Sequence, residues 1–107
     1  MADVAVAIGP GSTAETVSIA QGDRVVVRVG ETPTTGYRWQ FDLPGDLLSV
    51  DADEYRPGGA APGAAGERVV ALHATRPGHG TLTLRLARAW EGEPARTVRL
   101  AVTVRGD

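Results

Sequence analysis

Apolar and polar side chains alternate along most of this chain with a period of two residues. Val25, Val27 and Val29 show the pattern near the N-terminus, and Leu82 and Leu84 show it later in the chain. Apolar residues at every second position place one face of a β-strand against a core. A helical period does not compete with this pattern in any segment. The sequence therefore predicts an all-β fold.

Turn-forming residues divide the chain into about seven strands. Short alternating strands between Gly/Pro-rich turns predict an immunoglobulin-like antiparallel β-sandwich. The 107 residues suffice for one domain, spanning residues 1–107. The residues expected to face its core are Val4, Val6, Ile8, Val17, Ile19, Val25, Val27, Val29, Tyr37, Trp39, Phe41, Leu48, Val50, Val70, Leu72, Ala74, Leu82, Leu84, Leu86, Val98, Leu100, Val102 and Val104.

The first of these strands is interrupted by Gly9-Pro10-Gly11. Proline cannot donate to a strand ladder, so the strand must break there. Val17 and Ile19 then resume an apolar face. We expect an edge strand that crosses from one sheet of the sandwich to the other.

Composition and charge exclude several classes of function. There is no cysteine, which excludes disulfides, thiolate metal sites and a cysteine nucleophile. A net charge of -2 with scattered arginines argues against a nucleic-acid partner. No apolar run reaches the length of a membrane span. We expect a monomer without a cofactor, a metal or a membrane partner.

The N-terminus lacks a basic segment followed by an apolar one, as a signal peptide would have. The sequence as written therefore predicts a cytoplasmic protein. A periplasmic or secreted location is expected instead if a leader has been removed.

Connections that reverse the chain direction place every second loop at the same end of a sandwich. The tight turns at 20–23, 43–46 and 75–80 then share one end, and His79 is expected in the last of them. The connections at 30–36, 56–66 and 88–94 share the other end. Because binding residues concentrate on loops held by a rigid scaffold, the second end is the candidate site.

The connection near residue 33 should be a stiff, uncharged turn. Pro33 fixes its own φ angle and holds Thr32 extended. Gly36 can adopt a positive φ angle, which a tight return into the next strand requires. Thr34 and Thr35 are β-branched and restricted at χ1.

Trp90 follows the last inward leucine of its strand, in a connection that also contains Gly92 and Pro94. Its ring could fold back onto the end of the core. It could equally be an exposed anchor, because tryptophan is enriched among interface hot spots. Both alternatives place a large ring close to residues 33–36.

Three segments resemble the signature motifs of the chagasin family. Thr32-Pro33-Thr34-Thr35-Gly36-Tyr37, followed by Trp39, is similar to the family's Asn-Pro-Thr-Thr-Gly-Tyr/Phe motif, with Thr32 in place of asparagine. Gly63-Ala64-Ala65-Gly66 resembles Gly-x-Gly-Gly, with Ala65 in the third position. Arg88-Ala89-Trp90 resembles Arg-Pro-Trp, with Ala89 in place of proline. The motifs occur in the same order and on the three connections that share one end.

The resemblance implies a small immunoglobulin-like inhibitor that binds papain-like cysteine proteases reversibly. It implies that residues 33–36 enter the active-site cleft, with Thr34 nearest the catalytic cysteine. Arg88 and Trp90 would contact one side of the cleft, and residues 63–66 the other. The departures at Thr32 and Ala89 lead us to expect weaker or narrower inhibition than is usual in the family.

Two other readings of the sequence differ in kind. A generic immunoglobulin-like module that binds protein or carbohydrate, without inhibitory activity, would explain the sandwich and an exposed Trp90. An enzyme would need a base, and His73 and His79 are the candidates. His73 is expected to face solvent and His79 to lie at the opposite end, while a Gly-x-Ser-x-Gly motif is absent. We therefore expect no catalytic residues.

Overall fold

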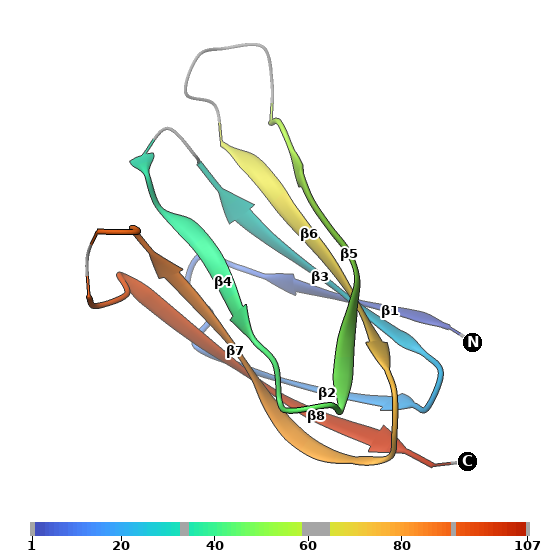
Figure 1. Ribbon diagram of the computed structural model, residues 1–107. Helices are drawn as coiled ribbons and strands as arrows, with labels where there is room; N and C mark the ends of the chain where they lie inside the picture. Colours follow the sequence, from blue (N-terminus) through green and yellow to red (C-terminus); the bar gives the residue numbers. More distant parts are fainter. Residues whose placement is uncertain (1, 33–34, 59–64, 91, 107) are drawn as a thin grey trace.

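The computed structural model describes residues 2–32, 35–58, 65–90 and 92–106, which form an all-β structure. Its strands are β1 (Asp3–Ile8), β2 (Ala14–Ala20), β3 (Arg24–Glu31), β4 (Arg38–Asp42), β5 (Leu48–Arg56), β6 (Gly66–Ala74), β7 (Gly78–Ala87) and β8 (Arg96–Arg105). The first sheet has the order β1-β3-β6-β5, and the second sheet has the order β2-β8-β7-β4. The two sheets form a sandwich (Figure 1), which confirms the predicted fold class.

The strand interrupted at residues 9–11 does cross between the sheets. β1 pairs with β3 in the first sheet, and β2 pairs with β8 in the second. Both pairs are parallel, whereas the other four pairs are antiparallel. The crossing was predicted from Gly9-Pro10-Gly11, and the resulting division into β1 and β2 explains why eight strands form where about seven were expected.

The core lies between the two sheets and consists almost entirely of aliphatic side chains. Its buried members are Ile8, Val17, Ile19, Val25, Val27, Val29, Trp39, Leu47, Leu48, Val70, Leu72, Ala74, Leu82, Leu84, Val98, Leu100, Val102 and Val104. Val4, Val6, Phe41, Leu43 and Leu86 pack against this core while partly exposed. The period-two pattern therefore placed most of the inward residues correctly.

Three expectations about individual residues were wrong. Val50 pairs with the buried Leu72 but is itself 50% exposed, because β5 is an edge strand of the first sheet; a β-bulge follows it, between Val50 and Ala52. Tyr37 precedes β4 and is only partly buried, outside the core. His79 lies within β7, which begins at Gly78, and not in the preceding turn.

The two ends of the sandwich carry different connections. At the turn end, the Gly22 amide donates to the Ala74 carbonyl and the Thr75 amide to the Leu47 carbonyl, each at 3.0 Å. These bonds join the three tight turns, as predicted. The β3–β4 and β7–β8 connections lie at the opposite end, here called the loop end (Figure 1). The described residues include no helix long and apolar enough to cross a membrane.

Candidate functional site

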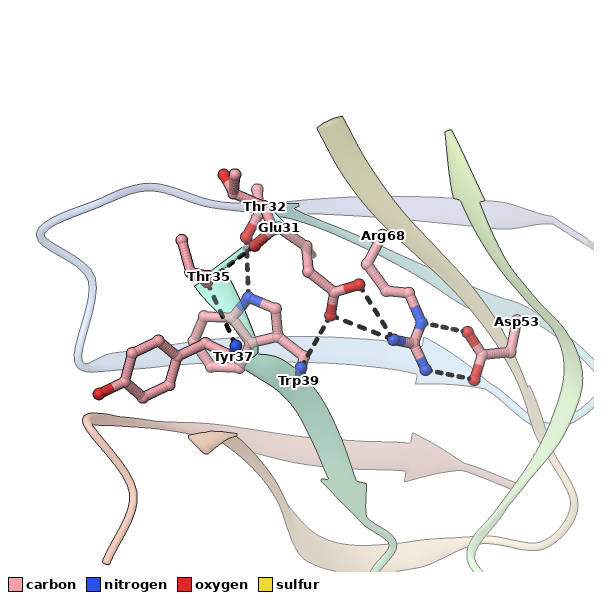
Figure 2. A network of polar contacts seen from close by, with 8 residues as sticks. Glu31, Thr32, Thr35, Tyr37, Trp39, Asp53 and Arg68 are labelled. Carbon is pink, nitrogen blue, oxygen red and sulfur yellow. Dashed lines mark hydrogen bonds and ion pairs between the residues drawn. The ribbon is translucent and has the colours of Figure 1, made fainter. Parts of the chain in front are cut away.

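The connection from Thr32 to Tyr37 joins β3 of the first sheet to β4 of the second, so it crosses between the sheets. The amide and the hydroxyl of Thr35 both donate to the Thr32 carbonyl, at 3.1 and 2.8 Å. The same hydroxyl accepts a hydrogen bond from the Tyr37 amide at 3.2 Å (Figure 2). Gly36 has a φ angle of 82°, as the sequence predicted. Pro33 and Thr34 lie outside the described residues.

Arg88 joins this connection to the one that follows β7. Its guanidinium carbon lies 4.2 Å from the centroid of the Tyr37 ring and 5.7 Å from that of Trp90. Its Nε donates to the Thr35 carbonyl at 3.2 Å. Cation–π contacts of this kind hold a guanidinium against aromatic faces. Two of the three predicted motifs are therefore in direct contact.

Trp90 is exposed and does not fold back onto the core. Its side chain has 71% of its surface accessible, the largest exposed apolar side chain among the described residues. One edge of the ring lies against Gly36, where a β-carbon would come within 2.8 Å of Trp90 Cη2. Gly36 therefore supplies both the positive φ angle and the space for the ring. The neighbouring Ala89 is also exposed.

The third motif is described only in part. Gly63 and Ala64 lie outside the described residues, Ala65 precedes β6, and Gly66 begins it. Gly66 pairs with Glu31, the last residue of β3, so this motif reaches the same end of the sandwich. A β-carbon at Gly66 would lie 2.5 Å from the backbone carbonyl oxygen of Arg56 as well as 2.1 Å from the Tyr55 hydroxyl, so only glycine fits there without a shift of the backbone.

A buried carboxylate closes the base of the Thr32–Tyr37 connection. Glu31 is the one buried charged residue among those described, and its Oε2 accepts a hydrogen bond from the Trp39 amide at 2.8 Å. The indole Nε1 of Trp39 donates to the Gly30 carbonyl, also at 2.8 Å. Arg68 Nη1 lies 3.1 Å from Glu31 Oε2, and beyond it the guanidinium binds Asp53 (Figure 2).

The charges in this cluster reinforce one another. The hydrogen bond from Arg68 holds the pKa of the Asp53 carboxyl below its ordinary value, although partial burial acts in the opposite direction. The same hydrogen bond, with the charge of Glu31, raises the pKa of Arg68. Asp53 and Arg68 are therefore charged at neutral pH, and Arg68 supplies the cationic partner that a buried carboxylate such as that of Glu31 requires.

A fourth connection, between β1 and β2, also lies at the loop end. Because β1 runs parallel to β3, both strands finish at the same end. Arg96 holds this connection, since its Nη2 donates to the carbonyls of Gly9 and Ser12, the latter at 2.9 Å. Its guanidinium also lies 5.5 Å from the centroid of the Trp39 ring. Arg96 thus ties the crossing strand to the same tryptophan that Glu31 contacts.

Comparisons with known proteins identify the family. The sequence model of the chagasin family of peptidase inhibitors, I42, matches residues 18–104. This chain belongs to the chagasin family. It is 30% identical over 96 residues to amoebiasin-2 of Entamoeba histolytica, covering 84% of this chain and 77% of that protein.

Two solved structures share the fold of this chagasin-family chain. The cysteine protease inhibitor EhICP2 of Entamoeba histolytica has a TM-score of 0.81 at 24% identity, over 97% of this chain and 96% of that chain. PbICP-C, solved in complex with falcipain-2, has a TM-score of 0.71 at 17% identity, over 95% of this chain and 99% of that chain. The chain is thus a protease inhibitor and not an enzyme, and nothing in these comparisons supports a binding module without inhibitory activity.

Sequence reasoning did not predict three charged residues that hold the connections of the loop end, although the sequence contains a signal for each. They are Glu31, Arg68 and Arg96. Glu31 continues the inward positions of Val25, Val27 and Val29, and Arg68 shares the parity of Val70. Arg96 likewise shares the parity of Val98. A charged residue on the inward parity at the end of a strand needs a partner, and all three lie at the loop end.

Proposed function

We propose that this protein inhibits papain-like cysteine proteases reversibly, by placing its loop end in the active-site cleft. The observation that carries the proposal is the contact between the Thr32–Tyr37 connection and the exposed Trp90, made through Arg88. Family membership supports it, as do EhICP2, a cysteine protease inhibitor, and PbICP-C, which binds falcipain-2.

The connection between the two sheets is the segment that enters the cleft, with Thr34 nearest the catalytic cysteine. It is central because it runs from the first sheet to the second, between the other two motifs. Arg88 and Trp90 contact one wall, and residues 63–66 contact the other. Three such connections can cover about 800 Å² per partner, the size of a standard interface.

Internal hydrogen bonds explain how this segment can occupy a protease without being cleaved. The Thr32 carbonyl accepts two hydrogen bonds from Thr35, and the Thr35 carbonyl accepts one from Arg88. Cleavage requires a scissile carbonyl that turns toward the donors of an oxyanion hole. Carbonyls that are already bonded within the inhibitor resist that turn, and a segment ordered before binding loses little entropy in the complex.

Trp90 is the expected anchor of the interface. An exposed indole that is already held in place by Gly36 and Arg88 can fill a pocket without losing much rotamer freedom. Trp90→Ala should therefore weaken inhibition by about tenfold or more, as for a hot-spot aromatic residue.

The test is a titration of papain activity with the purified protein, followed by mass spectrometry of the inhibitor. Stoichiometric loss of activity with the chain intact is the expected result. Val50→Ala is the matched control for Trp90→Ala, because Val50 is the other exposed large apolar side chain described, on β5. It should inhibit as the parent does.

Two results would contradict the proposal. A folded parent protein that leaves papain and related proteases active at tens of micromolar would reject inhibition itself. Cleavage within residues 32–37 would show that this segment is a substrate. Equal inhibition by Trp90→Ala and the parent would remove Trp90 as the anchor and leave the rest standing.

A further inference from the structure

The two ends of the Thr32–Tyr37 connection belong to strands that do not pair with each other. β3 lies in the first sheet and β4 in the second, so no ladder of backbone hydrogen bonds sets their separation. Two hydrogen bonds do so instead, from the Trp39 amide to Glu31 and from the Trp39 indole to the Gly30 carbonyl. The first depends on the side chain of Glu31, and the second on the side chain of Trp39.

We propose that Glu31, oriented by Arg68, is a positioning residue that holds the Thr32–Tyr37 connection in its binding conformation. The inference rests on the proposed inhibitory function and adds a residue outside the three motifs. Glu31 does not face the protease, because its side chain is fully buried. It acts through Trp39, because its carboxylate accepts a hydrogen bond from the Trp39 amide near the start of β4.

Arg68 and Asp53 extend this role to a second connection. Arg68 on β6 contacts both Glu31 and Asp53, and Asp53 lies on β5. β5 and β6 are the strands that enclose residues 57–65, which include most of the third motif. The series Asp53–Arg68–Glu31–Trp39 therefore crosses four strands and both sheets at the loop end (Figure 2). A shift of one binding connection is transmitted to the other through the side chains of Asp53, Arg68 and Glu31 and the amide of Trp39.

Two substitutions at one position separate the hydrogen bond from the charge. Glu31→Gln keeps an oxygen that accepts from the Trp39 amide, and Glu31→Leu removes it. Glu31→Leu should raise the inhibition constant for papain by about tenfold, because the connection is no longer ordered before binding. The inhibition constant of Glu31→Gln should stay within about threefold of the parent value.

Two controls exclude a general loss of stability. Glu67→Gln breaks the exposed Arg28–Glu67 ion pair, which joins the same two strands, β3 and β6. Val70→Ala opens the core on β6 without touching the connection. Both variants should inhibit as the parent does at a temperature where they are folded. Equal inhibition by Glu31→Leu and Val70→Ala would show that Glu31 stabilises the fold and positions nothing.

Amide hydrogen exchange measures the order of the Thr32–Tyr37 connection in the absence of a protease. The Thr35 and Tyr37 amides, both hydrogen-bonded within the connection, should exchange about tenfold faster in Glu31→Leu, since local opening governs their exchange. The Gly22 and Thr75 amides at the turn end should be unchanged. This readout stands even if the parent fails to inhibit papain, so failure of the positioning role and failure of the inhibitory function are distinguishable.

If Glu31→Leu does not fold, the exposed variant Asp53→Ala tests the same positioning role by amide exchange. Asp53→Ala removes the outer carboxylate that orients Arg68, and Asp51→Ala removes a neighbouring carboxylate that lies 4.0 Å from Arg24. Asp53→Ala should increase exchange at Thr35 and Tyr37 by about threefold, as expected for loss of one outer member of a network. Equal exchange in the two variants would overturn the proposed coupling.

Discussion

The two ends of the sandwich differ in how much of the hydrogen bonding between their segments comes from the backbone. At the turn end, bonds between backbone groups join the turns, as in the Gly22–Ala74, Thr75–Leu47 and Gln21–Arg105 pairs. The side chain of Asp23 adds to them by accepting from the Ala20 and Ala2 amides. At the loop end, the bonds between segments come mainly from side chains, those of Glu31, Arg88 and Arg96. Backbone hydrogen bonds, which predominate at the turn end, can form with almost any residue type. The side-chain hydrogen bonds of the loop end form only with particular residues.

This difference explains why the recognisable motifs gather at one end. A turn built from backbone bonds needs only a glycine or a proline in the right place, as at Gly22 and Gly45. A connection built from side-chain bonds fixes several residue types at once. The loop end therefore carries both the binding residues and the residues that hold them, and substitutions at the two ends should have separable effects.

The largest effect on stability is expected at the turn end, from Gly80→Ala. A β-carbon there would lie 2.5 Å from the Pro44 β-carbon and 3.1 Å from Leu47 Cδ2. Proline cannot move aside easily, so overpacking should lower the free energy of unfolding by about 2–3 kcal/mol in urea titrations. The folded variant should still inhibit papain, and weaker inhibition would show that the two ends are coupled.

Gly36→Ala and Gly22→Ala compare the ends at equal backbone strain. Both glycines have positive φ angles, 82° and 92°, and each alanine should cost about 1–2 kcal/mol of unfolding free energy. Only Gly36 faces a ring, because an added β-carbon at Gly22 meets nothing within 4 Å. Gly36→Ala should therefore displace Trp90 and weaken inhibition by about tenfold or more, whereas Gly22→Ala should not. Equal inhibition constants would place the Trp90 ring outside the interface.

Arg96→Met and Arg76→Met compare a partly buried arginine with an exposed one. Arg96 donates to two carbonyls of the β1–β2 connection, and its loss should lower the unfolding free energy by about 1 kcal/mol. Arg76 pairs with Asp46 at the turn end, where both are exposed, so its loss should cost about 0.5 kcal/mol or less. Thermal unfolding of the two variants measures the difference. A larger loss for Arg76→Met would reverse the contrast between the ends.

The smallest expected difference is in the response to acid. Amide hydrogen bonds from Ala20 and Ala2 lower the pKa of Asp23 at the turn end, and the Arg68 hydrogen bond lowers that of Asp53 at the loop end. A carboxyl whose pKa is lower in the folded state stabilises the fold above its ordinary pKa. This contribution is lost as the pH falls through the folded-state value, between about pH 5 and pH 2.

Urea unfolding at pH 6 and pH 3 should therefore show a smaller loss of stability for Asp23→Asn and for Asp53→Asn than for the parent. Asp53→Asn alone should also change amide exchange at Thr35. An acid response identical to that of the parent in both variants would assign the pH dependence to other carboxylates, such as Asp3 and Asp46, whose pKa values are lowered as well.

The sequence predicted the sandwich well because burial repeats every second residue in its strands. The alternation of β3 and β8 holds at their core positions, whereas residues 69–72 of β6 are all buried, and Gly9-Pro10-Gly11 marks the crossing. Val50 was misplaced because it lies on an edge strand, and the position of a strand within its sheet cannot be read from the alternation of that strand alone. Exposure of Trp90 could not be decided either, because it depends on the space beside Gly36, which belongs to another connection.

The sequence predicted the exposed residues of the candidate site but not the buried ones that support them. Motif resemblance identified Arg88 and Trp90, which the structure brings to Tyr37 and Gly36. Glu31 and Arg68 belong to no motif, and their pairing depends on the β3–β6 register, which places Arg68 opposite Val29 and next to the end of β3. Register between distant strands is a tertiary property, so it cannot be read from either strand alone.

The parallel pairing of β2 with β8 has a consequence for how the chain is synthesised. β2 is translated early and β8 last among the eight strands, yet residues 14–20 pair only with residues 99–105 in the second sheet. Closing so long a loop of chain is slow, as for all-β domains in general, which fold in milliseconds to seconds. On the ribosome, β2 and β7 each lack their shared neighbour until β8 emerges. The second sheet is therefore completed only once β8 has been synthesised, and its unpaired strands are until then the part of the nascent chain most open to aggregation.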